Sequence, residues 1–162
     1  MNQQRSRPES RVKEALDAAG IRATVMELPQ SARTSAEAVQ AIGCTVAQIA
    51  KSVVFRRSDT GSAVLVLLRG VDRVDTAALA SHLGSQVERA TPEFVRETTG
   101  FAIGGVAPLG HVKPIETLLD EALLEYDVVW AAAGTPNAVF SADPRQLAGL
   151  ATVGAVAERD RR

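Results

Sequence analysis

Residues 51–69 read KSVVFRRSDTGSAVLVLLR, two apolar runs separated by a short polar segment. The runs Lys51–Arg57 and Ser62–Arg69 are rich in β-branched and aliphatic side chains, which favour β-strands. Asp59-Thr-Gly61 between them has the composition of a turn. The pattern predicts a β-hairpin, whose two strands are antiparallel and adjacent in a sheet.

Helical patterns flank the hairpin on both sides. Val12, Leu16 and Ala19 are spaced at i, i+4 and i+7 before Gly20, which indicates an amphipathic helix. Capping boxes, in which a hydroxyl and a later Glu or Gln satisfy the first backbone N–H groups, predict two more helix starts. These are Thr34-Ser-Ala-Glu37, whose helix ends at Gly43, and Thr45-Val-Ala-Gln48; further helices are expected from Asp75 to Gly84, from Thr91 to Gly100 and after Asp143.

Three other short segments have strand character, namely Ala23–Leu28, Val128–Ala132 and Asn137–Ser141. The last two are expected to pair through the turn Gly134-Thr-Pro-Asn137. Short helices and strands therefore intermix along the chain. This order favours a mixed or antiparallel sheet with helices outside it over a doubly wound parallel sheet.

Length and composition indicate a single globular domain. The chain has 162 residues, of which 46% are hydrophobic, enough to bury a core. We expect the domain to span residues 10–157, with flexible tails at 1–9 and 158–162. The formal net charge of -1 excludes a strong overall basic field, and the 4% of aromatic residues argue against a platform for stacking single-stranded bases. A nucleic-acid ligand would have to be gripped locally.

Cysteine content and hydropathy favour a cytoplasmic protein. Cys44 is the only cysteine, so no internal disulfide can form and a reducing compartment fits. Met1–Arg11 lacks the apolar stretch of a secretory signal, and the most apolar run, Ala63–Leu68, is too short to span a bilayer. One cysteine and two histidines cannot supply the four ligands of a structural zinc site. We therefore expect no metal and no membrane partner.

A glycine-rich segment is one candidate for chemistry. Gly104-Gly-Val-Ala-Pro-Leu-Gly110 cannot form a helix or an ordinary strand, and such a loop can direct several backbone N–H groups at one point. Inward-facing amides would stabilise an oxyanion or bind a phosphate. The alternative is a plain structural turn. The sequence contains no G-x-S-x-G, H-E-x-x-H or P-loop motif that would indicate a familiar catalytic class.

A second candidate is Lys51, at the start of the apolar strand. Its ammonium must reach water, a carboxylate or a ligand, and inside a cavity it would suit a phosphate or a ribose. The alternative is a lysine that extends its ammonium to solvent at the strand end. Four arginines near the strand ends could steer an RNA acceptor end, or could be solvated rim charges. They are Arg56, Arg57, Arg69 and Arg73.

Two further side chains are weaker candidates. His111 follows the glycine-rich segment and could act as a general base, or could be a solvated loop residue. Cys44 lies between Gly43 and the expected helix start at Thr45, where a thiolate could be stabilised; a small core residue is the alternative interpretation. A cysteine-dependent hydrolase that uses Cys44 is therefore one hypothesis for this chain.

Four segments carry a more specific signal when they are taken together. They are Ser31-Ala-Arg-Thr-Ser-Ala-Glu-Ala38, Ile49-Ala-Lys-Ser-Val-Val-Phe55, Gly104-Gly-Val-Ala-Pro-Leu-Gly110 and Ala132-Ala-Gly-Thr-Pro-Asn-Ala-Val-Phe140. In this order and spacing they resemble the YbaK/EbsC family of stand-alone aminoacyl-tRNA deacylases, and they are similar to the editing domain inserted in bacterial prolyl-tRNA synthetases. The resemblance extends from about Arg11 to Val156.

The resemblance implies a fold, a reaction and an anchor residue. The implied fold is a single α/β (α+β) domain with a mixed, largely antiparallel, partly closed sheet and the site in a cleft. The implied reaction is hydrolysis of the ester bond of misacylated tRNA without metal or cofactor, in which a hydroxyl of the terminal ribose takes part. Lys51 matches the family's lysine that contacts the phosphate or terminal adenosine, and the Gly104–Gly110 loop would hold the scissile carbonyl and the attacking water.

As site residues we therefore expect a catalytic group and a substrate-binding group. The catalytic group is Lys51 with the backbone amides of Gly104 and Gly105, which would stabilise the oxyanion. In the substrate-binding group, Thr34, Pro108 and the Gly134–Asn137 turn would shape a small pocket that excludes bulky amino acids, and Ser52 would help Lys51 to fix the acceptor end. This group comprises Thr34, Ser52, Pro108, Gly110, Gly134, Thr135 and Asn137.

One segment departs from the family pattern. Some relatives carry a lysine-arginine-glycine segment followed by an aspartate where this chain has Thr135-Pro-Asn-Ala-Val139, so the role of that aspartate does not carry over. The expected substrate is a misacylated tRNA(Pro)-type acceptor end with a small amino acid, and prolyl-tRNA synthetase is a candidate partner. The alternative on the same fold is a non-catalytic module that recognises an aminoacyl-tRNA end or a nucleotide.

Overall fold

The computed structural model describes residues 7–29 and 35–159, and the expected hairpin lies at the centre of its largest sheet. Strands β2 (Ala50–Arg57) and β3 (Ala63–Arg69) pair antiparallel over seven residue pairs. The prediction of a hairpin from the sequence is therefore confirmed.

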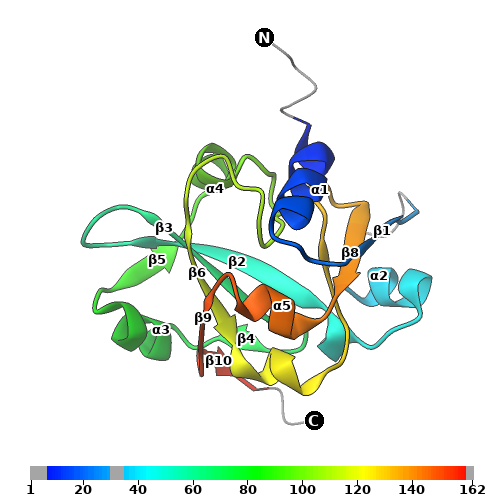
Figure 1. Ribbon diagram of the computed structural model, residues 1–162. Helices are drawn as coiled ribbons and strands as arrows, with labels where there is room; N and C mark the ends of the chain where they lie inside the picture. The colour runs from blue at the N-terminus through cyan, green and yellow to red at the C-terminus, as the bar shows by residue number, and fades with distance from the viewer. Residues whose placement is uncertain (1–6, 30–34, 160–162) are drawn as a thin grey trace.

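Three short strands complete this sheet, in the order β5-β2-β3-β6-β9 (Figure 1). Strand β5 (Val87–Arg89) pairs antiparallel with β2. Strands β6 (Glu116–Asp120) and β9 (Thr152–Gly154) run parallel to β3 and to each other. The sheet is mixed, as expected, although no pattern in the sequence indicates β6 or β9.

A second, three-stranded sheet lies beside the first, and a two-stranded ribbon completes the described strands. The two larger sheets meet where Ile49, just before β2, forms a single parallel bridge with Trp130. The expected single α/β domain with a mixed, largely antiparallel sheet is confirmed. The expectation of a partly closed sheet is wrong, because the sheets of the described residues stay open and this bridge joins the two larger ones. The second sheet has the order β1-β8-β7, with bounds Thr24–Glu27, Ala138–Ala142 and Val129–Ala132, and the ribbon pairs β4 (Arg73–Val74) with β10 (Ala157–Glu158).

The expected helices surround the sheets, and several begin with the caps that the sequence indicates (Figure 1). The side chains of Asp75 and Thr91 each accept a hydrogen bond from the backbone N–H three residues later. The Thr45 N–H donates to Gln48 Oε1 over 3.0 Å, one half of the predicted capping box. The helices are α1 (Pro8–Ala18), α2 (Ser35–Ile42), η2 (Val46–Gln48), α3 (Thr76–Leu83), α4 (Pro92–Thr99), η3 (Glu121–Glu125) and α5 (Pro144–Ala148).

The folded elements extend slightly beyond the expected boundaries of 10 and 157. Helix α1 begins at Pro8, a residue that suits the first turn because no intrahelical partner is needed for its missing N–H. At the other end, Glu158 belongs to β10 and lies opposite Arg73. Pro8, Glu9 and Glu158 therefore belong to the domain and not to the tails.

Strand β3 is buried on both faces, which explains its continuous apolar run. Leu65 and Leu67 face the larger core cluster, together with Phe140 of β8. Val64 and Val66 face a second cluster on the other side of the sheet. All five side chains are at most 1% exposed, so truncating one of the leucines to alanine would cost about 2–5 kcal/mol of stability. This core holds β2, the strand that carries Lys51, in place.

Candidate active site

A cavity of about 240 Å³ lies where the two larger sheets meet. The start of β2 contributes Lys51 and Ser52 to its wall, and the glycine-rich segment contributes Gly104. Trp130 of β7 and Pro136, in the turn before β8, line it as well. The fold thus brings three of the expected site residues, Lys51, Ser52 and Gly104, to one cavity.

Strand geometry places Lys51 and Ser52 on opposite sides of β2. Ile49 is bridged to Trp130, so their side chains lie on the same face of the joined sheets. Because side chains alternate along a strand, Lys51 shares this face with Ile49. Ser52 points the other way, as does the core residue Ala50. Both residues line the cavity, which lies at the seam of the two sheets.

The Lys51 ammonium is half-buried and lies among other charges. Its Nζ donates a hydrogen bond to the Gly70 carbonyl over 3.4 Å. Burial is the main cause that lowers the pKa of Lys51. The Asp72 carboxylate opposes this shift, and the nearby Arg89 and Arg73 add to it. An anionic ligand would offset both the burial and the repulsion, so this position suits a phosphate.

The Ser52 hydroxyl is the one buried side-chain polar atom that lacks a hydrogen-bond partner in the described part of the chain. Leaving such a group unpaired costs about 1–3 kcal/mol, and native proteins contain few of them. Ser52 also lines a second cavity of about 110 Å³, whose walls include Val95, Ile103 and Arg89. A ligand or a water in either cavity would satisfy the hydroxyl.

Only part of the glycine-rich segment can offer backbone donors to the cavity. The Gly105 N–H donates to the Ala102 carbonyl over 2.9 Å, so it is not free to stabilise an oxyanion, and that expectation is corrected. Glycine is needed there because a Cβ would lie 2.8 Å from Thr135 Cα. The N–H groups of Gly104 and Val106 have no hydrogen-bond partner among residues 7–29 and 35–159. Both residues line both cavities, which makes them the candidate donors.

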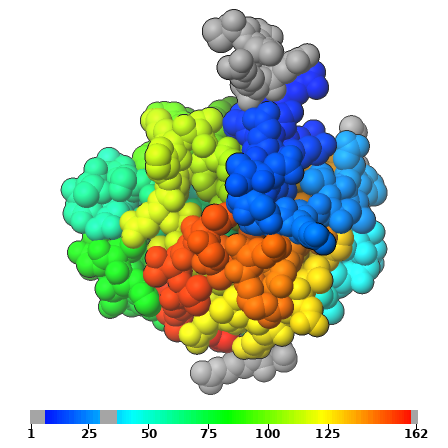
Figure 2. Space-filling view, viewed as in Figure 1, coloured from blue at the N-terminus to red at the C-terminus, as the bar shows by residue number. Residues whose placement is uncertain are grey.

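The second half of the segment packs against α1 (Figure 2). The Arg11 Nε donates to the Gly110 carbonyl over 3.3 Å, and a Cβ on Gly110 would lie 3.0 Å from the Arg11 carbonyl oxygen. Figure 2 shows the yellow-green chain around this segment in contact with the blue α1. Pro108 is buried and lines neither cavity. Gly110, expected to bind substrate, therefore seats the loop on the helix, and Pro108, also expected to bind substrate, is buried outside both cavities.

The turn before β8 contributes to the cavity through Pro136 alone. Its neighbours Gly134 and Thr135, expected to bind substrate, make close contacts within the protein. A Cβ on Gly134 would lie 2.7 Å from the carbonyl carbon of Pro8, and Thr135 lies against Gly105. These two residues position Pro136 and do not line the cavity.

Asn137, a further expected substrate contact, ties this turn to the end of β1. Its Nδ2 donates to the Pro29 carbonyl over 3.1 Å, and its own carbonyl accepts a hydrogen bond from the Leu28 N–H over 2.6 Å. Asn137 therefore fixes the point from which the chain enters residues 30–34, and it has a positioning role. Thr34, the remaining expected contact and a predicted helix cap, lies outside the described residues.

The two weaker candidates lie outside both cavities. The His111 Nε2 donates to the Ala107 carbonyl over 2.8 Å, and burial lowers the pKa of this histidine. Burial raises the pKa of the Cys44 thiol, which disfavours the thiolate that a nucleophile requires. These observations favour structural roles for both residues over the general base and the cysteine nucleophile.

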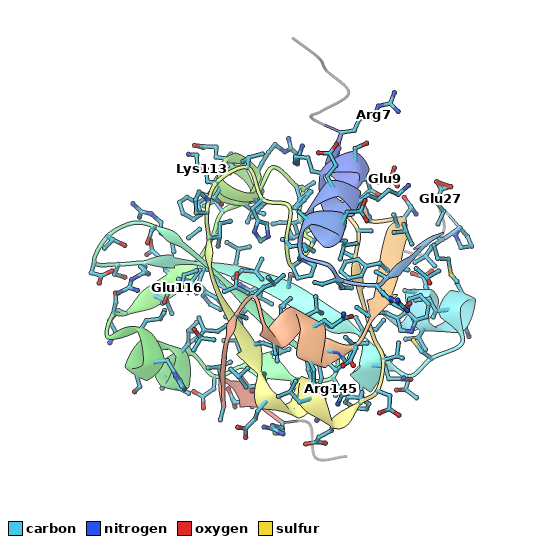
Figure 3. The ribbon with its side chains drawn as sticks, viewed as in Figure 1. Arg7, Glu9, Glu27, Lys113, Glu116 and Arg145 are labelled. Carbon is cyan, nitrogen blue, oxygen red and sulfur yellow. The ribbon has the colours of Figure 1, made fainter. Side chains whose placement is uncertain are left out.

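Most of the arginines considered for RNA steering are engaged elsewhere. Arg73 is exposed and forms no ion pair in the described part of the chain. The same holds for Arg89, a residue that the sequence did not single out and that lines the smaller cavity. The remaining three arginines are held in the pairs Arg56–Glu88, Arg57–Asp59, Arg57–Glu116 (Glu116 is labelled in Figure 3) and Arg69–Asp72.

Neither a metal cluster nor a membrane span is found in the described residues. No group of three or more His, Cys, Asp or Glu side chains is placed to hold a metal ion. No helix among them is long and apolar enough to cross a bilayer.

The fold and the cavity define a small α/β domain with a cleft at the seam of two sheets, suited to a ligand that carries an anionic group. Residues 29–150 match the aminoacyl-tRNA editing domain family. The matched range includes β2, the glycine-rich segment, β7 and β8. The chain therefore belongs to this family. The resemblance seen in the sequence is confirmed.

Known relatives agree with this assignment. The chain is 31% identical over 123 residues to the uncharacterized protein YwhH of Bacillus subtilis, covering 76% of this chain and 78% of YwhH. It is 30% identical over 128 residues to an Enterococcus faecalis protein provisionally named Cys-tRNA(Pro)/Cys-tRNA(Cys) deacylase EbsC, covering 73% and 77% of the two chains. A crystal structure provisionally described as a trans-editing enzyme for prolyl tRNA synthetase matches with a TM-score of 0.88 and 47% identity, over 94% of this chain and 98% of that one.

Proposed function

We propose that this protein is a trans-editing deacylase that hydrolyses the ester bond of a misacylated tRNA(Pro)-type acceptor end carrying a small amino acid. Membership of the editing-domain family supports the class of reaction. The names of the EbsC relative and of the structural neighbour support the type of tRNA. The observation that carries the proposal is the convergence of Lys51, Ser52 and Gly104 on one cavity of about 240 Å³.

Lys51 anchors the acceptor end in this proposal. Lys51 lines the cavity, and burial and two arginines disfavour the charge on its half-buried ammonium, while Asp72 favours it. A phosphate of the terminal nucleotides would add a negative charge that favours the charged ammonium. The Ser52 hydroxyl, which has no partner among the described residues, donates to an oxygen of the same ligand.

The reaction itself needs a water and two backbone donors. The water adds to the ester carbonyl carbon, and the oxygen that becomes negative accepts hydrogen bonds from the N–H groups of Gly104 and Val106. The carbon–oxygen bond to the terminal ribose then breaks, and the ribose oxygen leaves with a proton from the attacking water. Each donor is worth a factor of about 10² to 10³ in rate. A ribose hydroxyl of the substrate orients the water, so the scheme requires no histidine base.

The lining of the cavity supports selection of a small amino acid. Its wall includes Ala50, Ala131 and Ala138, so it is lined in part by methyl groups. Trp130 and Pro136 are rigid and limit its width. A cavity of this kind admits a small amino acid, whose ester is then hydrolysed, and excludes amino acids with larger side chains. This is how a second sieve works.

A non-catalytic binding module on the same fold is the second candidate. The specific observation in its favour is the Gly105 N–H, which is bonded to the protein's own Ala102 carbonyl and leaves fewer donors than expected. The Thr135–Val139 segment, which lacks the aspartate of some relatives, points the same way.

A panel of mischarged tRNAs separates the two candidates. Purified protein, far below the substrate concentration, is incubated with tRNA(Pro) charged with alanine, serine, cysteine or proline, and released amino acid is measured against the spontaneous rate. We expect many turnovers with at least one small amino acid and none with proline. Saturable binding of the charged tRNA without release would contradict the deacylase and favour the binding module.

A further inference from the structure

One arginine of α1 joins the two ends of loop 100–110, the stretch that follows α4 and contains the glycine-rich segment. The Arg11 Nη2 donates to the Gly100 carbonyl over 2.7 Å, and its Nε donates to the Gly110 carbonyl over 3.3 Å. Both donors belong to one planar guanidinium, so their separation is fixed. A single side chain therefore sets the distance between the two ends of the loop.

The ends of the loop are closed tightly around this guanidinium. A Cβ on Gly100 would lie 2.6 Å from Arg11 Nη2 and 2.6 Å from Val112 Cγ1, so this end of the loop requires a glycine. The Val112 N–H donates to the Thr99 carbonyl over 3.2 Å, which joins the two ends a second time. The chain thus forms a compact loop with neighbouring ends, the arrangement of an Ω-loop.

A chain of contacts runs from the guanidinium toward the cavity. The Arg11 Cζ lies 5.0 Å from the centroid of the Phe101 ring, which is buried, a distance typical of a cation–π contact. The Phe101 ring meets the His111 ring edge to face, with centroids 6.0 Å apart. The His111 Nε2 donates to the Ala107 carbonyl. Ala107 follows Val106, so these contacts reach the residue next to a candidate oxyanion donor.

Backbone hydrogen bonds alone do not hold the tip of the loop in place. In the described structure, the one backbone hydrogen bond between two residues of loop 100–110 joins the Gly105 N–H to the Ala102 carbonyl. The N–H groups of Gly104 and Val106 are the candidate donors, and each must keep its direction while it has no described partner. The direction of these donors therefore depends on contacts with the rest of the protein.

We propose that Arg11 is a positioning residue of the site, whose guanidinium bridges the Gly100 and Gly110 carbonyls and thereby holds the N–H groups of Gly104 and Val106 at the cavity. This inference rests on the oxyanion role proposed for these two N–H groups. Arg11 touches no substrate in this scheme and acts through the loop. It lies outside residues 29–150, so α1 adds a part of the site that the matched range does not include.

Replacement of Arg11 tests the proposal through rate and affinity separately. Arg11→Met keeps the aliphatic stem and the helix propensity but removes both donors. We expect kcat for mischarged tRNA to fall by about 10-fold or more, since each oriented donor contributes a factor of about 10² to 10³. KM should change little, because Lys51 and Ser52 are untouched. Lys13→Met is the matched control at an exposed position of the same helix and should keep the parental kcat.

Two further variants separate positioning from stability. Leu79→Ala destabilises the core cluster on the other side of the large sheet and leaves the bridge in place. At a temperature where both variants are folded, Arg11→Met should lose kcat and Leu79→Ala should not. Arg11→Lys keeps the charge without the planar fork, so its kcat should also fall. Parental kcat in whichever Arg11 variant folds, or an equal loss in Leu79→Ala, would overturn the proposal.

Hydrogen exchange at Gly105 follows the loop without any substrate. Its N–H is bonded within the loop, whereas the amides of β3 exchange through global unfolding. In Arg11→Met, exchange at Gly105 should quicken about 10-fold more than exchange in β3, because a bond from a charged donor is lost. In Leu79→Ala it should not outpace β3.

A Gly105 exchange rate in Arg11→Met that rises no more than the rates in β3 would overturn the proposal. Should the parent protein hydrolyse no tRNA, the proposed function fails, yet the exchange rates still decide whether Arg11 fixes the loop.

Discussion

At the scale of single residues, the proposed site depends on the charge of Lys51, which the apolar strand should not need for folding. We expect Lys51→Ala to reduce kcat/KM for mischarged tRNA by about 10- to 100-fold, the loss of one charge-assisted contact worth about 1.5–3 kcal/mol. Thermal stability should change little, because the one hydrogen bond of the ammonium to the described residues is the 3.4 Å bond to the Gly70 carbonyl. Lys113→Ala is the control, since Lys113 is exposed on the segment before β6 (Figure 3). Near-parental activity of Lys51→Ala would remove the anchor from the scheme.

Ser52 gives a second prediction, because its hydroxyl has no hydrogen-bond partner among the described residues. We expect Ser52→Ala to leave the free energy of unfolding unchanged or to raise it, while KM for the charged tRNA rises. The contrast is Thr99→Val: the Thr99 hydroxyl is buried, donates to the Val95 carbonyl over 2.7 Å and accepts from the Phe101 N–H. Urea unfolding should show a loss of about 1–3 kcal/mol for Thr99→Val. A comparable loss for Ser52→Ala would show that its hydroxyl has a structural partner.

The same scale shows what a sequence can and cannot reveal about a site. Lys51 is visible because a charge at the start of an apolar strand is unusual. Val106 is not visible, because its contribution is a backbone N–H while its side chain has the character of a core residue. Gly110 is misinterpreted because its close neighbour, Arg11, is 99 positions away in the chain.

At the scale of elements, the proposed scheme divides the glycine-rich segment into a catalytic and a structural half. Gly104→Ala meets nothing closer than Pro136 Cγ at 3.8 Å, so its cost is the strain of a φ near 95°, about 1–2 kcal/mol. Gly110→Ala adds a contact of 3.0 Å with the Arg11 backbone to a φ of 81°, so it should destabilise the fold more. We expect kcat/KM, measured well below the melting temperature, to fall in Gly104→Ala and to be retained in whatever Gly110→Ala protein folds. Equal losses of stability and rate in Gly104→Ala would favour a purely structural turn.

The elements that the sequence reveals are those whose signals are local. Caps such as Asp75 and Thr91 and the β2–β3 hairpin depend on neighbouring residues, and they form as expected. Strand β6 gives no such signal: Leu118 and Leu119 face opposite core clusters, so the strand shows no alternation, and its parallel partners lie far away in the chain. The parallel pairing of the five-residue strand β6 is therefore fixed by its contacts in the tertiary core.

At the scale of the whole molecule, weak overall charge and a local cationic site have to be reconciled with an RNA substrate. The chain carries a formal net charge of -1, so long-range attraction to tRNA is weak. The fold compensates by placing Arg73 and Arg89 close enough to Lys51 to act on its charge, while other arginines are neutralised in ion pairs. Recognition of the acceptor end should therefore involve few phosphates.

This view predicts a shallow salt dependence of tRNA binding. If three cations each neutralise one phosphate of the single-stranded acceptor end, a plot of log K against log salt should have a slope near -2, about -0.7 for each contact. Binding is measured with a tRNA whose amino acid is joined by a non-hydrolysable amide, so that turnover does not interfere. Lys51→Ala should make the slope shallower by about 0.7, and Lys113→Ala should leave it unchanged. A slope several units steeper in the parent protein would mean that the tRNA contacts an extended basic surface, which contradicts recognition through this cavity alone.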